Sequence, residues 1–360
     1  MVVRVSAPGK LFVVGEYGVL VGAPAVIATL DQRLICRVAG PTRPERIALR
    51  SADLGMAWDR ATGPAADLPA GLRYAAAAAA AALDSARDAA AGSEPRGVLE
   101  IEIERGFDDG PAKRGMGGSS AVVAAVLGAI HAHRTGGLPV GPARRLLAAR
   151  ALAVHRRVQG SGSGADAAAA VLGGPVLLRV APANTRGAET DLLLEAEPLA
   201  LPDPLAFRIV ATGKPAASGP RARRFVDSWQ GQGPLGEPGG ELLREWGRVV
   251  AQTVLHFRNA CVSGREGEVL RAFRQSGLLL GYLERLAGLP MHAAGLRRAC
   301  TIAARHGSPA KPSGAGGGDC AIAIVSNQDD QSLRRAWLEQ GFEPLDIGFQ
   351  SEGLRLEEAA

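Results

Sequence analysis

A loop rich in glycine and serine, Gly115-Met116-Gly117-Gly118-Ser119-Ser120-Ala121, leads into an apolar run of helical composition, 121–133. The start of a helix carries unpaired N–H groups and the positive end of the helix dipole, and glycines let a bound group approach the backbone. Serine hydroxyls can donate to phosphate oxygens, and one could ligate Mg²⁺. The stretch therefore predicts a phosphate-binding loop. Taken alone, it is equally compatible with a serine N-cap after a flexible turn.

Two other glycine-rich loops lie further along the chain. Gly160-Ser161-Gly162-Ser163-Gly164 opens an alanine-rich helix whose first turn holds Asp166, a carboxylate that could orient or deprotonate an attacking hydroxyl. The helix dipole alone would also favour an aspartate there. Lys311–Asp319 has four glycines in nine residues and runs straight into the apolar strand 320–325. Close approach of this backbone to a ligand or a neighbouring loop explains that composition better than a plain linker does.

Lysine is rare in this chain, because 37 of its 41 basic residues are arginines. The four lysines are Lys10, Lys113, Lys214 and Lys311, and each stands within or beside a segment rich in glycine, proline or serine. Arginine does not replace lysine where a compact ammonium must reach a phosphate or a reacting oxygen. Lys10, which follows Ala7-Pro8-Gly9, is therefore a candidate for neutralising charge on a transferred phosphoryl group. The competing interpretation is a solvated turn lysine.

Composition argues against several classes of protein. No apolar run reaches the length of a membrane span and no basic-then-apolar leader is present, so we expect a cytoplasmic protein without a membrane partner. The four cysteines lie far apart, as free thiols would in a reducing compartment. The net charge is +5, but aromatic residues are only 4% and the arginines are dispersed, which is not typical of a nucleic-acid partner. The densest basic segment, 221–224, is expected to be a solvated face or an anion contact. The sequence carries no signal for an oligomeric state.

Strands and helices are interspersed without regular βαβ alternation, which predicts an α+β fold. Two short strands, 2–5 and 11–14, are expected around a turn at Ala7-Pro8-Gly9. The other strands are expected at 25–30, 34–38, 98–104, 176–180, 205–211, 320–325 and near 345–349. Helices are expected at 72–90, 121–133, 142–158, 241–261, 266–286, 291–306 and 331–340, with a further short helix after Gly164. The polar, proline-rich segment 181–204 has the composition of a boundary between two lobes.

Three of these segments resemble the motifs of the GHMP kinases, the superfamily of galactokinase, homoserine kinase, mevalonate kinase and phosphomevalonate kinase. They are Ala7-Pro8-Gly9-Lys10-Leu11 with Gly15-Glu16-Tyr17, then Gly115–Ala121, and finally Lys311–Cys320. Together they span nearly the whole chain. The resemblance implies a two-lobed fold, with an N-terminal, S5-domain-2-like, ATP-binding lobe at 1–195 and a C-terminal, ferredoxin-like α/β sandwich lobe at 196–360.

Within the superfamily the sequence most resembles the phosphomevalonate kinases. That family has Gly-Glu-Tyr where mevalonate kinases have Gly-Glu-His, and its third motif is similar to the string Lys-Pro-Ser-Gly-Ala-Gly-Gly-Gly-Asp-Cys found here at Lys311–Cys320. Segment 213–218 also looks like a substrate-side loop of that family. The resemblance implies transfer of the ATP γ-phosphoryl group to 5-phosphomevalonate, giving 5-diphosphomevalonate and ADP in the mevalonate route to isoprenoids.

The resemblance also implies roles for individual residues. Lys10 and Asp166 are the catalytic candidates; Lys10 would neutralise charge, and Asp166 would position groups more than accept a proton, because the acceptor phosphate is already ionised. ATP and its phosphates would bind Gly115, Met116, Gly117, Gly118, Ser119, Ser120 and Ala121, with Mg²⁺ on Ser119 or Ser120. The substrate would bind Lys10, Glu16, Tyr17, Ser163, Lys214, Ser218, Ser313, Gly314, Ala315 and Gly316.

The sequence departs from the family pattern in two places. Gly118 disturbs the usual Gly-Leu-Gly-Ser-Ser-Ala-Ala register, which leaves the metal-ligating serine open between two positions. Mevalonate kinases carry a metal-binding glutamate about where this chain has His155, so Mg²⁺ would rest mostly on ATP phosphates, one serine and waters. His155 is expected to be a helix residue or an anion contact. Arg156, Arg157 and Lys214 could bind the additional phosphate, or could be ordinary surface cations.

Several alternatives remain at this point. Mevalonate kinase activity would require Asp166 to act as a true base toward a hydroxyl. A non-catalytic GHMP-type metabolite-binding protein would be expected to lose Lys10, Asp166 or a glycine loop, and all of these are present. A nucleic-acid-binding protein would show binding that weakens steeply with salt. Homoserine or sugar kinase activity fits Tyr17 and Asp319 less well.

Overall fold

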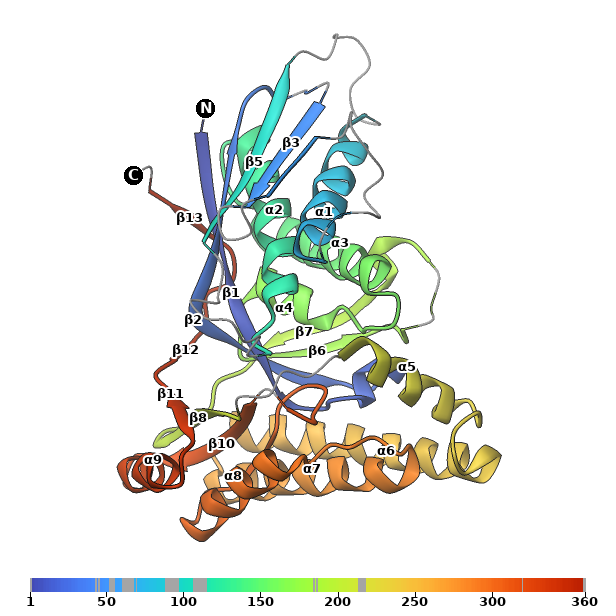
Figure 1. Cartoon of the computed structure of the whole chain (residues 1–360), viewed down its shortest axis with the longest axis vertical. Helices are drawn as coiled ribbons and strands as arrows, with labels where there is room; N and C mark the ends of the chain where they lie inside the picture. Colours follow the sequence, from blue (N-terminus) through green and yellow to red (C-terminus); the bar gives the residue numbers. More distant parts are fainter. Residues whose placement is uncertain are drawn as a thin grey trace.

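The structure is a computed structural model that describes residues 2–42, 44, 46–51, 56–59, 68, 70–87, 97–105, 115–183, 185, 187–212, 218–318 and 320–358. Figure 1 shows two lobes, one containing both chain termini and the other built mainly of long helices. Both lobes combine helices with a sheet, without regular βαβ alternation. The predicted α+β fold is therefore confirmed.

The larger sheet forms the N-terminal lobe. Its main path runs β13-β1-β2-β5-β3-β4, with β6 and β12 also paired to β2 and β7 paired to β6. The strands are β1 (Val2–Val14), β2 (Ala25–Ala39), β3 (Arg46–Ser51), β4 (Met56–Asp59), β5 (Val98–Arg105), β6 (Val176–Val180) and β7 (Leu193–Pro198). Strand β1 pairs with β2 along most of its length, and its far end contributes Val13 and Val14 to the core of the other lobe.

The prediction of two short strands around a turn at Ala7-Pro8-Gly9 was wrong. Strand β1 is continuous, and the register of its pairing with β2 shifts between Pro8 and Lys10. Proline has no N–H to donate to a sheet ladder, and such residues are accommodated at bulges. The freed backbone N–H of Lys10 donates instead to Met116 O at 2.8 Å. The same prediction split β2 into two strands, although it too is continuous.

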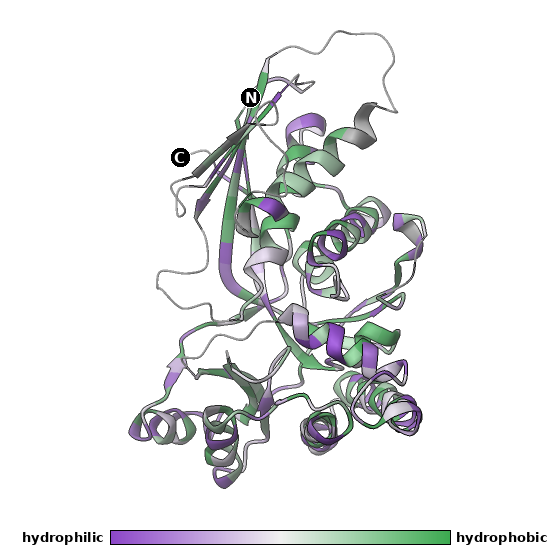
Figure 2. Cartoon of the chain, turned by 45° about the vertical axis from the view of Figure 1, so that its right-hand side comes forward, coloured by the Kyte–Doolittle hydropathy of each residue, from purple (hydrophilic) through white to green (hydrophobic). Residues whose placement is uncertain are grey.

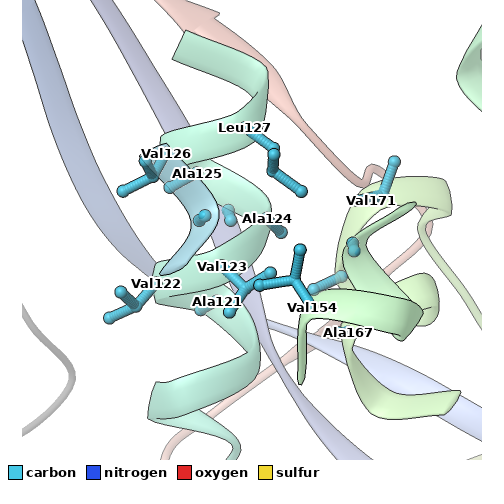
Figure 3. Close-up of a cluster of buried hydrophobic side chains, with 14 of the residues drawn as sticks. Ala121, Val122, Val123, Ala124, Ala125, Val126, Leu127, Val154, Ala167 and Val171 are labelled. Carbon is cyan, nitrogen blue, oxygen red and sulfur yellow. The ribbon is translucent and has the colours of Figure 1, made fainter. Parts of the chain in front are cut away.

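Helices α1 (Ala70–Arg87), α2 (Gly118–Thr135), α3 (Gly141–Gln159) and α4 (Ala165–Leu172) pack beside this sheet. Helix α2 is apolar on nearly every side, as expected of a helix enclosed by other elements. Figure 3 shows Val123, Ala124 and Leu127 on the side of α2 that faces Val154 of α3 and Ala167 and Val171 of α4, whereas Val122 and Val126 point the other way. Small residues let these helices approach closely, which brings the starts of α2 and α4 near the middle of α3.

The C-terminal lobe contains a four-stranded antiparallel sheet in the order β11-β8-β10-β9. Its strands are β8 (Leu205–Ala211), β9 (Ala310–Pro312), β10 (Cys320–Ser326) and β11 (Glu343–Leu345). Its helices are α5 (Ser218–Trp229), α6 (Gly236–Val262), α7 (Glu266–Leu286), α8 (Ala294–Arg305) and α9 (Asp330–Glu339). Figure 2 shows mixed polar and apolar colouring on these helices, typical of amphipathic helices with one solvent-facing side.

Two features of this half of the chain were not predicted. Helix α5 was missed; it places Arg221 and Arg224 so that they donate to the carbonyls of Pro290 and Ala287, each at 3.0 Å. Arg223 and Arg224 are exposed, as expected of a solvated face, and Arg221 and Arg224 additionally hold backbone carbonyls. The chain also returns to the first lobe at its end, where β12 (Phe349–Gln350) pairs with β2 and β13 (Arg355–Glu357) pairs with β1.

None of the helices in the described part of the chain combines the length and apolar character needed to cross a membrane. All four cysteines are free thiols.

The thiols are expected to react slowly in the folded protein. Burial raises the pKa of Cys261 and Cys300 to about 12 and that of Cys36 still further. At about pH 8 a thiol of that pKa is roughly one part in ten thousand thiolate, the reactive form. Labelling with iodoacetamide, counted by mass spectrometry, should be far slower in native buffer than in urea. A cysteine labelled equally fast in both conditions would contradict this expectation.

Candidate active site

The glycine-serine loop and Lys10 form one packed unit. Helix α2 begins at Gly118, and the residue before it, Gly117, has a left-handed backbone with φ of 88°. A Cβ atom added to Gly117 would lie 2.7 Å from Lys10 Cε and 2.8 Å from Lys10 Cγ. The lysine side chain therefore passes directly over the loop, and glycine is required there for both space and conformation.

Replacing Gly117 with alanine should impair activity more than stability alone explains. We expect kcat to fall by about tenfold, because the new methyl group displaces the Lys10 ammonium from its position. Gly136→Ala is the matched control, since Gly136 has a similar φ of 85° at the end of the same helix and no atom within 4 Å of an added Cβ. Both variants should lose similar stability in urea unfolding, and only Gly117→Ala should lose turnover. Equal kcat in the two would contradict the expectation.

Asp166 lies in the first turn of α4, with its carboxylate facing Lys10 Nζ at 3.6 Å. Burial acts to raise the pKa of Asp166, but the neighbouring His155 and Lys10, with hydrogen bonds from Ser120 and from the Ala167 N–H, lower it to about 2. Lys10 itself is 8% exposed. The structure thus brings the two predicted catalytic residues together as a largely buried pair with an ionised carboxylate.

His155 lies beside this pair. From the sequence it was expected to be a helix residue or an anion contact. Its Nε2 lies 3.1 Å from Ser119 Oγ and 3.5 Å from Ser120 Oγ, and its Nδ1 lies 3.7 Å from Asp166 Oδ1. Its ring stacks on Tyr74 at a centroid distance of 5.0 Å. Burial lowers the pKa of His155 more than the nearby carboxylate raises it, so the imidazole is neutral near pH 7. Lys10 is then the cation that keeps Asp166 ionised.

A pocket of about 570 Å³, part of it open to solvent, lies next to these residues. Its walls come from β1, the loop before α4, the start of α5 and the glycine loop after β9. The predicted site residues that line it are Lys10, Glu16, Tyr17, Ser163, Asp166, Ser218, Gly314 and Ala315. Gln159 also lines it and was not predicted; a single glutamine at a helix end gives no sequence signal. Loops distant in sequence thus share one cavity.

The other predicted substrate-binding residues have different surroundings. Ser313 is buried, and its hydroxyl donates to Phe12 O at 3.0 Å, while Gly316 packs closely against Met291. Both tie the glycine loop to its neighbours, outside the pocket lining. Lys214 lies outside the described residues, as do Asp319 and Lys113.

The first and third motifs are joined by a buried ion pair. Lys311 Nζ donates to Glu16 Oε1 and, at 3.2 Å, to the carbonyl of Pro312, and it lies 5.5 Å from the centre of the Phe273 ring. Both charged side chains are 1% exposed. Beside them the Tyr17 hydroxyl donates to Ala315 O at 2.8 Å. Glu16 and Tyr17 therefore fix the glycine loop at the edge of the pocket.

Arg156 and Arg157, suggested above as phosphate-binding cations, are engaged elsewhere. The Arg156 guanidinium donates to the carbonyls of Ser163, Ala181 and Pro182. The Arg157 side chain is 67% exposed and faces Glu189 at 4.0 Å. The suggestion that Arg156 binds the additional phosphate was wrong, because its guanidinium group holds the loop containing Ser163 in place. Among the described residues that line the pocket, Lys10 is the one cation.

Comparisons with known proteins agree with this geometry. Residues 73–174 match the model of the GHMP kinases N terminal domain, and residues 257–343 match that of the GHMP kinases C terminal. The phosphomevalonate kinase of Streptomyces sp. (strain CL190) is 28% identical over 97% of both chains. A Lin0012 protein from Listeria innocua has a similar fold, with a TM-score of 0.81, 20% identity and 100% of both chains covered.

The Streptococcus pneumoniae phosphomevalonate kinase, in complex with phosphomevalonate and AMPPNP, also shares the fold. Its TM-score is 0.75 at 20% identity, with 97% of this chain and 100% of that chain covered. The two family matches and the full-length similarity to a curated kinase support the same family as the three glycine-rich loops. The chain belongs to the GHMP kinase family and is a phosphotransferase.

Proposed function

We propose that this kinase transfers the γ-phosphoryl group of ATP to the phosphate of 5-phosphomevalonate, giving 5-diphosphomevalonate and ADP. The observation that carries the proposal is the Lys10–Asp166 pair, 3.6 Å apart, in a pocket walled by parts of the first and third motifs and adjoining the glycine-serine loop. The full-length likeness to a curated phosphomevalonate kinase supports the choice of substrate.

The low pKa of Asp166 favours a phosphate acceptor over a hydroxyl. An effective general base has a pKa near the working pH, and a carboxylate of pKa about 2 is a weak base. A phosphate monoester has its second pKa near 6, so it is already largely ionised at neutral pH and needs no base. Asp166 would then hold Lys10 in place, and Lys10 would offset the negative charge that gathers between donor and acceptor phosphates.

The loop and the start of α2 are suited to the donor phosphates. The first turn of α2 has free backbone N–H groups and contains Ser119 and Ser120. These hydroxyls fit Mg²⁺, which takes hard oxygen ligands and usually keeps waters and nucleotide phosphates in its shell. Within the described residues no three His, Cys, Asp or Glu side chains gather as candidate metal ligands. Bound Mg²⁺ would neutralise phosphate charge.

A coupled assay of ADP release, run with 5-phosphomevalonate and mevalonate side by side, tests the proposal. We expect phosphomevalonate to be used with a kcat/KM at least about a hundredfold higher, because a site built for a charged group discriminates strongly against an analogue that lacks it. Turnover of mevalonate alone would establish the mevalonate kinase alternative. ATP binding without turnover of either compound would favour a non-catalytic metabolite-binding protein.

A further inference from the structure

We propose that His155 is a positioning residue that links Asp166 to Ser119 and holds the Ser119 hydroxyl with its oxygen lone pair directed toward the cation carried by the donor phosphates. The inference rests on the proposed phosphoryl transfer and adds a role to it for a residue on α3. Four groups lie in a row, each in contact with the next: Ser119, His155, Asp166 and Lys10.

Each group in this row lies within contact distance of the next. His155 is 1% exposed, with Ser119 Oγ at 3.1 Å from Nε2 and Asp166 Oδ1 at 3.7 Å from Nδ1. The other carboxylate oxygen of Asp166 lies 3.6 Å from Lys10 Nζ. Figure 3 shows Val154, the neighbour of His155, between α2 and the side chains of Ala167 and Val171 on α4. The imidazole therefore connects the loop expected to bind the nucleotide with the pair expected to act on the transferred group.

One nitrogen of this imidazole has no hydrogen-bond partner. Nδ1 is fully buried without one, and the Asp166 carboxylate stands just beyond bonding distance. An unsatisfied buried nitrogen is unfavourable, so its persistence needs a reason. Hydrogen bonds at catalytic centres are often long in the empty protein and tighten when the reactants bind.

The direction of the hydrogen bonds follows from charge. An ionised carboxylate only accepts, so Nδ1 of His155 carries the proton that faces Asp166. In a neutral imidazole Nε2 is then an acceptor, and the Ser119 hydroxyl must donate to it. Ser119 is also hydrogen-bonded to the Tyr74 side chain. With its own proton directed at His155, Ser119 accepts from the Tyr74 hydroxyl and keeps one lone pair for a phosphate-bound cation.

The same geometry distinguishes the two serines. Ser120 is 0% exposed and is hydrogen-bonded to the Asp166 carboxylate. Ser119 is partly exposed at the first turn of α2. Ser119 is therefore the serine whose oxygen faces the nucleotide, and Ser120 supports the carboxylate.

The tautomer of His155 provides a test in the protein without any ligand. In ¹⁵N-detected NMR spectra of the imidazole groups near neutral pH, a protonated ring nitrogen and a bare one resonate far apart. We expect Nδ1 of His155 to be protonated and Nε2 bare, with the signals assigned by their loss in His155→Phe. A proton on Nε2 would overturn the proposal. This readout needs no turnover, so it stands even if the proposed substrate is wrong.

Kinetics of matched variants provide the second test. His155→Phe keeps a ring to stack on Tyr74 but removes both nitrogens, and should lower kcat about 10- to 100-fold with KM for ATP changed less than about threefold. His155→Gln places an amide where Nε2 was and should recover kcat to within about fivefold of the parent, whereas His155→Asn should not. If His155→Phe does not fold, the comparison of kcat between His155→Gln and His155→Asn tests the positioning role. The proposal fails if the kcat of His155→Asn equals or exceeds that of His155→Gln. It also fails if a folded His155→Phe variant keeps kcat within twofold of the parent enzyme.

His133 supplies the control for replacing a buried histidine. It is 4% exposed on α2, its Nε2 bonds to Gly40 O at 3.1 Å, and its Nδ1 also lacks a partner. His133→Phe makes the same chemical change away from the pocket. We expect it to lower thermal stability and leave kcat unchanged. An equal loss of kcat in His133→Phe and His155→Phe would show a general packing effect and overturn the positioning role.

Discussion

Replacing Lys10 with methionine is expected to lower kcat about 100- to 1,000-fold, the usual cost of removing one preorganised group that stabilises developing charge. Lys10 is the one cation among the described residues lining the pocket, and it lies 3.6 Å from Asp166. Methionine keeps the unbranched side chain that crosses Gly117, and the backbone N–H of residue 10 still reaches Met116 O. The change therefore removes charge with little change in shape.

Single-turnover kinetics with ATP and 5-phosphomevalonate would measure the effect. Arg248→Met is a suitable control, because Arg248 is 72% exposed on α6 and, within the described part of the chain, pairs with its helix neighbour Glu245. The control should keep parental kcat and similar stability in urea. A folded Lys10→Met variant with kcat within fivefold of the parent would contradict a charge-neutralising role.

The second large effect is on stability and concerns the buried Glu16–Lys311 pair. Removing one partner of a buried pair leaves an uncompensated charge, so Lys311→Met should lower the free energy of unfolding by about 3–5 kcal/mol. Both side chains are 1% exposed, and Glu16 Oε2 already lacks a partner. Adding Glu16→Gln to Lys311→Met removes the stranded charge.

The double variant should therefore be more stable than Lys311→Met alone, which urea unfolding of the four forms in a double-mutant cycle would show. The same pair anchors the glycine loop. Lys311→Met should therefore lose activity together with stability. The double variant should recover only part of the activity, because the anchoring contact is still absent. A double variant no more stable than the single one would mean that the pair is not electrostatically coupled.

The three glycine loops were predictable because their composition is explained by a physical requirement. Gly117 has to leave space for the Lys10 side chain, and that need is visible as glycine before a helix. Asp166 was predictable as the one carboxylate after a glycine-serine turn. The full-length α+β architecture followed from the order of apolar patterns, although the continuity of β1 through Pro8 did not, because pairing with β2 overrides the local turn signal.

His155, Gln159 and the role of Arg156 could not be predicted from the sequence. A single histidine or glutamine on a helix has no period or spacing, and only the packing of α2, α3 and α4 brings His155 to Ser119 and Asp166. Arg156 looked like a free cation because its three carbonyl partners come from two separate loops. The strand β13 is three residues long and pairs with β1 from the other end of the chain, which no local pattern encodes.

If the pocket beside Lys10 and Asp166 presents a phosphate acceptor to ATP, the product is a diphosphate. ³¹P NMR of the enzyme with ATP, Mg²⁺ and 5-phosphomevalonate, followed beside an identical sample containing mevalonate, would detect it. We expect the monophosphate resonance to be replaced by the two coupled resonances of a diphosphate as ADP forms, with no new monophosphate resonance in the mevalonate sample. An unchanged phosphomevalonate resonance, together with a new single monophosphate resonance in the mevalonate sample, would contradict this expectation.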